Sequence, residues 1–208
     1  DKIAATSKEL IISTGMSSLN ELDMTTKFLK AKQSRFSLLQ CSSSYPAPAS
    51  LWGLNQIEKL RERYQVPVGF SDHSGDIYAC LAATSLGAKI LEFHVTFDQR
   101  SYGPDSTSSL NIDQVKLLTK GIREIEIALA HPIDKTVIDS HSQVKNIFEK
   151  SLSVNKHLPA GHILQRDDLE SKKPKEMGLP AHSFEQVIGK KLSRTLEKWA
   201  FLTEQDIL

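Results

Sequence analysis

Two stretches decide the fold: Val66-Pro-Val-Gly-Phe-Ser-Asp-His73 and Lys89-Ile-Leu-Glu-Phe-His94. Each contains a short apolar run, typical of a buried strand, and each ends in a histidine. Residues 76–86 between them show the pattern of a helix. Strand, helix and strand in this order form a β-α-β unit, whose two strands are parallel neighbours. We therefore expect His73 and His94 side by side at the carboxyl edge of a sheet.

This pair of histidines has two interpretations. In the first, the imidazoles share one divalent metal ion at the edge where α/β barrels place their active sites. In the second, each histidine only caps its strand through hydrogen bonds, a common use of this side chain. The matched placement of the two residues favours the metal site.

The alternation of strand and helix patterns extends over the first 130 residues. Besides the β-α-β unit, the pattern predicts strands at 9–13 and 36–41 and helices at 18–32, 54–64 and 112–130. Ser18 and Glu21 have the spacing of a helix capping box. Four consecutive β-α units indicate a parallel sheet, and four units are half of a (β/α)8 barrel. Because a half barrel exposes sheet edges, we expect the missing half to be supplied elsewhere.

The sequence pattern changes after residue 131. Residues 132–147 are polar and poor in aromatic side chains, and we interpret them as a linker. Residues 148–208 contain short strand-like pieces separated by Pro and Gly turn signals, which predicts a small β-rich domain. A domain of about 60 residues is close to the lower limit for independent stability, so we expect it to dock on a larger body. The predicted domains are therefore the half barrel 1–131, the linker 132–147 and the β-rich domain 148–208.

Composition excludes several classes of partner. The formal net charge is +1 over 208 residues and no basic block occurs, so neither nucleic acid nor a membrane is expected as a partner. No apolar run reaches the roughly 18 residues of a membrane span, and residues 1–8 lack the apolar core of a signal peptide. Cys41 and Cys80 lie in apolar contexts, typical of reduced core thiols. We expect a cytoplasmic protein.

The residues at the end of each expected strand define a predicted rim that is rich in hydroxyl groups. Its members are Ser13, Thr14, Ser42, Ser43, Ser44, Tyr45, Ser71, Asp72, His73, Glu92, His94 and Asp105. Hydroxyl groups suit the recognition of phosphate, carboxylate and polyol groups. Glu92 and His94 are two residues apart in a strand, so their side chains share a face, whereas Asp72 points to the opposite one.

Simpler roles remain open for several rim residues. Residues 42–44 could only solvate a loop, Tyr45 could pack against the rim, and Asp105 could close a turn. A carboxylate inside a barrel needs a partner, which disfavours a purely structural Glu92. The other histidines are expected to be exposed to solvent: His131, His141, His157, His162 and His182.

Several short motifs, taken in order along the chain, resemble the sialic acid synthase family. In the first part they are Ile11-Ile-Ser-Thr-Gly-Met16, Ser44-Tyr-Pro-Ala-Pro48, Pro67-Val-Gly-Phe-Ser-Asp-His73, Glu92-Phe-His94 and Gly103-Pro-Asp105. The tail resembles the antifreeze-like, or SAF, domain of that family, through Leu158-Pro-Ala-Gly161, Asp168-Leu169, Lys173-Pro174 and Val187-Ile-Gly-Lys-Lys-Leu-Ser-Arg194. The resemblance implies an α/β fold: the C-terminal half of a (β/α)8 TIM barrel, followed by a small β-rich SAF domain of the β-clip type.

The resemblance also implies an activity. Enzymes of this family are nonulosonic acid synthases, such as N-acetylneuraminate synthase, which are transferases of sialic acid biosynthesis that form a C–C bond. They condense phosphoenolpyruvate with an N-acylated hexose such as N-acetylmannosamine and release phosphate. The implied cofactor is a divalent metal, Mn²⁺, with Mg²⁺ or Co²⁺ as alternatives. The implied assembly is a domain-swapped homodimer in which the SAF domain caps the partner's barrel.

Matching positions imply a role for nine residues. The metal ligands would be His73 and His94, and the acidic catalytic residue would be Glu92. Ser13 and Ser71 would contact phosphoenolpyruvate, and Ser43, Tyr45 and Asp105 would contact the sugar. Lys173 stands where the family usually has an arginine that reaches toward the acyl group in the partner's site.

This chain departs from the family pattern at several points. Phe93 stands where the family often has lysine, Ser106 where many members have histidine, and Lys173 cannot reproduce the bidentate geometry of arginine. These differences put the sugar in question more than the reaction. The family's first four strands are absent, so we expect the chain by itself to be inactive.

Two alternative functions stay open. A metal-dependent aldolase or lyase would need a Schiff-base lysine or a full carboxylate triad at the strand ends, and neither is visible. A non-catalytic binding or assembly module would use the β-rich tail for association only.

Overall fold

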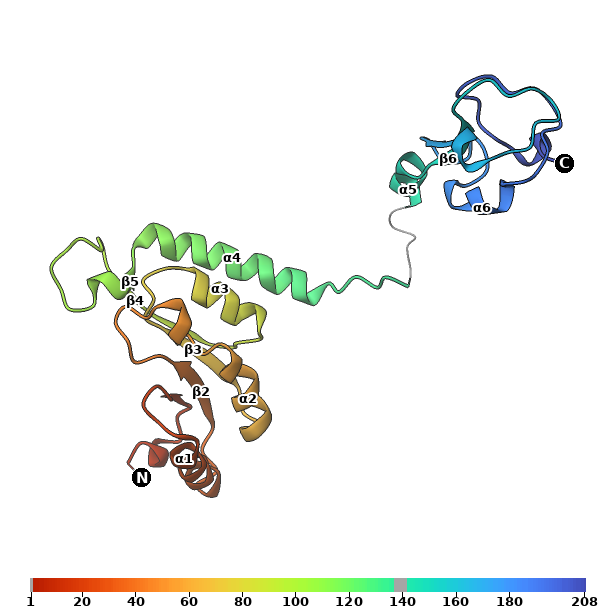
Figure 1. Cartoon of the computed structure of the whole chain (residues 1–208). Helices are drawn as coiled ribbons and strands as arrows, with labels where there is room; N and C mark the ends of the chain where they lie inside the picture. Colours follow the sequence, from red (N-terminus) through yellow and green to blue (C-terminus); the bar gives the residue numbers. More distant parts are fainter. Residues whose placement is uncertain (1, 137–141) are drawn as a thin grey trace. The chain divides into compact units, whose positions relative to one another are not determined.

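Parallel strands in sequence order form the sheet that carries the candidate site (Figure 1). The computed structural model describes residues 2–136 and 142–208, and the chain divides into two units, Asp1–Pro132 and Ile133–Leu208. The strands of the first unit are β1 Leu10–Ser13, β2 Phe36–Cys41, β3 Val68–Asp72, β4 Leu91–Val95 and β5 Ser109–Leu110, paired in the order β1-β2-β3-β4-β5. The predicted α/β fold with a parallel sheet is confirmed, and the sheet that the described residues form is not closed into a barrel.

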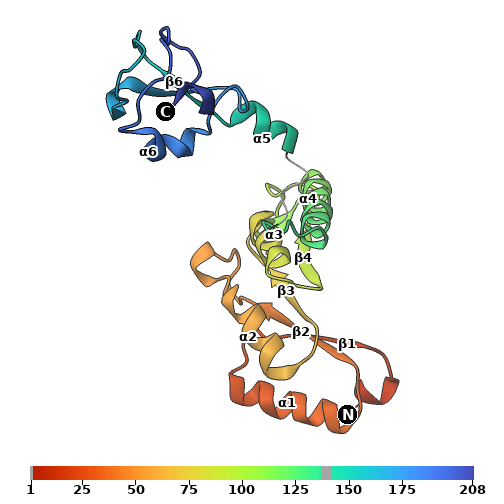
Figure 2. The ribbon, with the colours of Figure 1, turned by 90° about the vertical axis from the view of Figure 1, so that its right-hand side faces the viewer.

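Three helices connect β1 to β4, a fourth follows β5, and all four run along the sheet (Figure 2). They are α1 Leu19–Ala31, α2 Asn55–Tyr64, α3 Tyr78–Ser85 and α4 Ile112–Ala130. The predicted capping box of α1 is confirmed, because Ser18 and Glu21 exchange side-chain and backbone hydrogen bonds. In the part of the chain that the structure describes, none of the helices combines the length and apolarity that crossing a bilayer requires.

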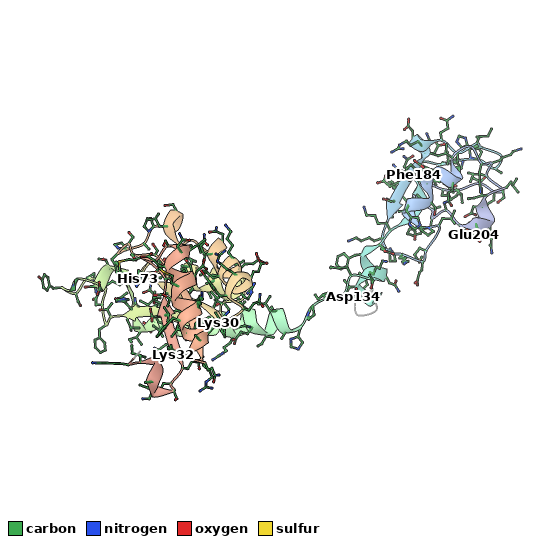
Figure 3. All side chains as sticks on the ribbon, turned by 90° about the horizontal axis from the view of Figure 1, so that it is seen from below. Lys30, Lys32, His73, Asp134, Phe184 and Glu204 are labelled. Atoms are coloured by element: carbon green, nitrogen blue, oxygen red, sulfur yellow. The ribbon has the colours of Figure 1, made fainter. Side chains whose placement is uncertain are left out.

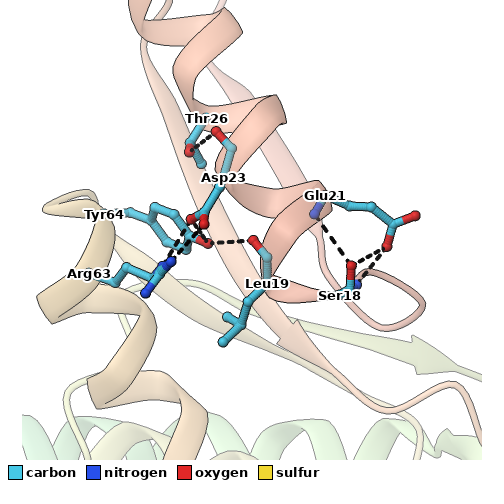
Figure 4. A network of polar contacts seen from close by, with 7 residues as sticks. All are labelled: Ser18, Leu19, Glu21, Asp23, Thr26, Arg63 and Tyr64. Carbon is cyan, nitrogen blue, oxygen red and sulfur yellow. Dashed lines mark hydrogen bonds and ion pairs between the residues drawn. The ribbon is translucent and has the colours of Figure 1, made fainter.

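A polar network joins α1 to α2 (Figure 4). Arg63 donates two hydrogen bonds to the Asp23 carboxylate, at 2.9 and 2.6 Å, and the Tyr64 hydroxyl donates a third at 2.9 Å. The hydrogen bonds from Arg63 and Tyr64 lower the pKa of Asp23 to about 2. These contacts, between residues 40 positions apart in sequence, fix the relative position of the two helices.

The two faces of the sheet differ in chemistry. Side chains such as Leu38, Phe70 and Phe93 face the helices and form one core with Leu60 and Leu118. Residues of opposite parity along the strands point the other way. Pairing places Ser71 level with both Cys41 and Glu92, and His94 level with Ser109. The face away from the helices is therefore polar at the carboxyl ends of the strands.

The strand boundaries differ from the predicted ones. β3 and β4 both lie two residues further along the chain than expected, so that His94 lies inside β4 instead of after it. The extension of β4 arises because β5 pairs with it through His94 and Val95. β5 was not predicted, because its two residues, Ser109 and Leu110, carry no periodic pattern.

The second unit is a small β-rich domain, as expected. It contains the antiparallel strands β6 Ser151–Val154 and β7 Leu169–Lys172, several 3-10 turns and the short helix α6 Phe184–Val187, which together enclose one core. The core residues are Leu152, Val154, Leu158, Leu164, Val187, Leu192, Leu196 and Leu202.

Two features of the tail were not predicted. Helix α5, Ser142–Phe148, covers the end of the expected linker 132–147 and the first residue of the expected β-rich domain. Residues 137–141 of the linker, with His141, lie outside the described residues. His162 is half-buried instead of exposed, because its Nε2 contacts the buried Asp168 carboxylate at 2.7 Å. His131, His157 and His182 are exposed, as predicted.

Candidate active site

The polar face of the sheet carries most of the predicted site residues at its carboxyl edge. Ser71, at 2% exposure, lies on β3, and its Oγ donates a hydrogen bond to Glu92 Oε1 on β4 at 2.6 Å. Cross-strand pairing of Ser71 with Glu92 makes this contact possible, since paired residues point to the same side. The expected partner for the Glu92 carboxylate is therefore present.

His73 lies among the side chains of the first unit (Figure 3) and is held in place by a hydrogen bond. It is 5% exposed, and its Nδ1 lies 2.9 Å from the Ser42 carbonyl oxygen. A carbonyl oxygen can only accept, so Nδ1 carries the proton and donates. The lone pair of Nε2 is then free, which is the usual state of a histidine that binds a metal.

His94 faces His73 across the edge of the sheet. The centroids of the two imidazole rings are 5.2 Å apart, and the ring planes meet at 67°. His94 Nδ1 is 3.7 Å from Asp105 Oδ2, and both side chains are half-exposed. The histidines that the sequence predicted to be neighbours thus lie together, and Asp105 lies beside them.

Tyr45 covers the two imidazoles. Its ring centroid is 4.1 Å from that of His73 and 6.0 Å from that of His94. Desolvation, together with the nearby Asp105 and Glu92 carboxylates, raises the pKa of Tyr45, so its hydroxyl group keeps its proton at neutral pH. Tyr45 therefore offers a hydrogen-bond donor at the mouth of the site.

The donor set fits a metal ion that also takes ligands from outside this chain. Across residues 2–136 and 142–208, no group of three or more His, Cys, Asp or Glu side chains is arranged to hold a metal. Two facing imidazoles supply two ligands and leave positions for water and substrate oxygen, a pattern of catalytic rather than structural sites.

Ser13 and Ser43 lie at the same edge of the sheet and are exposed. Ser43 Oγ lies so close to Gly15 that any side chain at position 15 would clash with it. The loops after β1 and β2 are therefore in contact, which brings these two predicted substrate contacts to one side of the histidine pair.

Phe93 and Ser106 make contacts of their own outside the polar face, and Lys173 lies in the other unit. Phe93 packs against the core on the helix side, and Ser106 Oγ donates to the Gly103 carbonyl oxygen at 2.8 Å. Both departures from the family pattern therefore leave the polar face unobstructed. Lys173 belongs to the second unit, where its Nζ lies 4.2 Å from the Phe148 ring centroid.

Two residues near the site were not predicted from the sequence. Cys41 is not a core thiol: it is half-buried on the polar face, and its Sγ is 4.0 Å from His73 Nδ1. Burial raises the pKa of Cys41, so the thiol stays protonated. Cys80 is buried, as expected.

The other residue that was not predicted is Gln99, whose amide bridges two loops of the site. Strand parity could have found Cys41, but no local pattern singles out Gln99.

Asp72 serves the turn after β3. It points to the helix side, is buried, and accepts hydrogen bonds from the backbone and the hydroxyl group of Ser74, both at 2.9 Å. Burial raises the pKa of Asp72. This carboxylate holds the turn that presents His73.

Comparison with known proteins agrees with this arrangement. The NeuB family model matches residues 1–134, and the SAF domain model matches residues 149–208. This chain belongs to the NeuB family. The resemblance to sialic acid synthases and their SAF domain is thereby confirmed, and so is the predicted fold class.

Relatives of this NeuB-family chain have related activities. The N,N'-diacetyllegionaminic acid synthase of Campylobacter jejuni is 35% identical over 91% of this chain. The human N-acetylneuraminate-9-phosphate synthase is 30% identical over 95% of it. A crystal structure of the N-acetylneuraminic acid synthetase of Leptospira borgpetersenii matches 68% of the chain and 50% of its own, with 32% identity and a TM-score of 0.62. The chain spans 57% of the Campylobacter enzyme and 55% of the human one.

Proposed function

We propose that this chain supplies the C-terminal half of the catalytic site of a nonulosonic acid synthase. The reaction would condense phosphoenolpyruvate with an N-acylated hexose, such as N-acetylmannosamine, and release phosphate. The observation that carries the proposal is the pair of imidazoles, His73 and His94, 5.2 Å apart at the carboxyl edge of a parallel sheet. Membership of the NeuB family supports the reaction class.

His73 and His94 would hold the divalent ion, with Mn²⁺ as the first choice and Mg²⁺ or Co²⁺ as alternatives. Bound there, such an ion supplies Lewis-acid polarisation of the sugar aldehyde. His73 Nδ1 donates its proton in the hydrogen bond to the Ser42 carbonyl oxygen, so Nε2 would be the atom that coordinates the ion.

The remaining groups of the polar face bind and orient the substrates. Glu92 accepts the Ser71 hydrogen bond through one carboxylate oxygen, and its other oxygen is available to accept a proton or a hydrogen bond from the reacting groups. Ser13 and Ser71 would donate to phosphoenolpyruvate. Ser43, Tyr45 and Asp105 would contact the hydroxyl and acylamino groups of the sugar.

Closure of the site requires parts beyond the sheet described here. Within the part of the chain that the structure describes, strands β1 and β5 each have a neighbour on one side only, so further strands are needed to enclose the substrates. We propose that the active enzyme has a closed barrel and is a domain-swapped homodimer in which the SAF domain of one subunit, with Lys173, covers the other's site. The chain by itself is then expected to be inactive.

Removal of either imidazole tests the metal site. His73→Ala and His94→Ala are expected to abolish Mn²⁺ binding to this chain, measured by electron paramagnetic resonance of the free ion. In a protein that joins the chain to a closed barrel, both changes should stop phosphate release from phosphoenolpyruvate and N-acetylmannosamine.

His131→Ala is the matched control, because His131 is exposed at the carboxyl end of α4, and helices of parallel α/β units end at the edge opposite the site. Unchanged Mn²⁺ binding and phosphate release in His73→Ala would refute the assignment.

A further inference from the structure

Gln99 joins the loops that carry the candidate site. It lies half-buried in the loop that follows β4. Its amide nitrogen donates one hydrogen bond to the Gly75 carbonyl oxygen at 2.8 Å and another to the Ser109 carbonyl oxygen at 2.7 Å. Gly75 belongs to the loop after β3, and Ser109 begins β5. One side-chain amide thus connects three segments of the chain.

Strand pairing does not hold these segments together. The pairing of β3 with β4 ends at Asp72 and Phe93, so His73 lies beyond it. The His73 carbonyl accepts a hydrogen bond from Ala47, which fixes it only to the loop after β2. Among the hydrogen bonds of the described residues, the one from Gln99 is the direct link between residues 73–77 and residues 94–110.

The linked loops are also in close contact. Gly75 has a φ of +74°, and a Cβ at this position would clash with the Thr107 carbonyl oxygen. Ser109 Oγ donates to the Asp105 carbonyl oxygen at 2.7 Å. The link through Gln99 therefore extends from the His73 loop to the backbone of Asp105, whose carboxylate faces His94.

We propose that Gln99 is a positioning residue, which sets the distance of His73 from His94 and Asp105 by holding their loops together. The inference rests on the proposed function, in which these residues form the site. Both protons of the amide are used, and both acceptors are carbonyl oxygens, so the position needs two donors. A glutamate side chain at position 99 has no donor and would place a charged oxygen against the carbonyl oxygens. A methionine side chain has no donor either, but it carries no charge. A lysine side chain keeps hydrogen-bond donors.

The test compares the whole chain with Gln99→Glu, Gln99→Met and Gln99→Lys. Gln65→Glu is the matched control, because the exposed Gln65 amide donates to the Glu62 carbonyl oxygen at the end of α2, outside the site. Two quantities are measured: the nuclear Overhauser contacts between the His73 and His94 rings without metal, and the affinity for Mn²⁺.

Gln99→Glu and Gln99→Met are expected to lose the ring contacts and to bind Mn²⁺ about tenfold or more weakly, the usual effect of removing a group that orients metal ligands. Gln99→Lys and Gln65→Glu should behave like the unchanged chain. If circular dichroism shows that Gln99→Glu does not fold, the uncharged variant Gln99→Met alone decides whether Gln99 positions the two rings.

Retained ring contacts and Mn²⁺ affinity in Gln99→Met would overturn the inference. If the unchanged chain binds no Mn²⁺, the metal part of the proposed function fails instead, and the ring contacts, which need no metal, still decide the role of Gln99.

Discussion

His73 and His94 differ in how firmly each ring is held. His73 is buried and its Nδ1 has a carbonyl partner, whereas His94 is half-exposed and its nearest charged neighbour, Asp105, is at 3.7 Å. That distance is longer than a hydrogen bond. The His94 ring is therefore less constrained than the His73 ring, and Asp105 lies on the loop that Gln99 holds.

In the second unit, the buried carboxylate of Asp168 makes stability depend on pH. Its side chain is 2% exposed. Burial acts to raise the pKa of Asp168, but hydrogen bonds from Lys156, His162 and the Gln165 amide outweigh this effect and lower it to about 2. Since the folded value lies below the unfolded one, the stabilisation is complete above about pH 4 and is lost as the pH falls toward 2.

Asp168→Asn is therefore expected to lower the free energy of unfolding at pH 7 by about 2 kcal/mol, the equivalent of this pKa difference. The gap between the variant and the unchanged chain should narrow by more than half between pH 7 and about pH 2.5. Urea unfolding of the second unit at both pH values checks this. Asp167→Asn, a change at the exposed neighbouring carboxylate, is the control, and an equal effect of the two substitutions would contradict the explanation.

At the scale of elements, the sequence pattern predicted the helices better than the strand ends. The α4 helix covers Ile112–Ala130, as expected, because its apolar side chains recur at helical spacing. The short strands have only alternation to mark them, so β3 and β4 were displaced by two residues. Strand ends depend on where pairing stops, which is a property of the neighbouring strand.

Two adjacent leucines of α4 test which face of the helix is buried. Leu118 is 0% exposed and belongs to the core, whereas Leu117 is 57% exposed. Leu118→Ala is expected to lower the free energy of unfolding of the first unit by about 3 kcal/mol, through lost burial and a cavity. Leu117→Ala should cost less than about 1 kcal/mol. Equal losses in chemical denaturation would show that α4 packs differently.

At the scale of the whole molecule, the proposed function requires that further strands and a second subunit contribute to the candidate site. In a protein that joins this chain to a closed barrel, we expect a dimer by sedimentation equilibrium. Lys173→Ala should raise KM for the N-acylated hexose about tenfold, the loss of one charge-assisted hydrogen bond, without a matching change for phosphoenolpyruvate.

Lys172→Ala, a change at the neighbouring lysine, is the control. Lys173→Arg should retain a low KM for the N-acylated hexose, because arginine keeps the charge and adds bidentate geometry. A monomer with full activity, or equal KM values in Lys173→Ala and Lys172→Ala, would contradict the proposed swap.

Local pattern alone determined the order of β1 to β4 with their connecting helices, the parallel sheet, and the neighbouring positions of His73 and His94. These features follow from periodicity and from the geometry of the β-α-β unit, which act over short stretches of sequence. Strand parity groups the residues of a strand into two faces, but the tertiary structure decided which face the helices cover, and so left Cys41 on the site face and Phe93 in the core. It also decided the link made by Gln99, since hydrogen bonds between residues 24 and 10 positions apart depend on how loops meet in space.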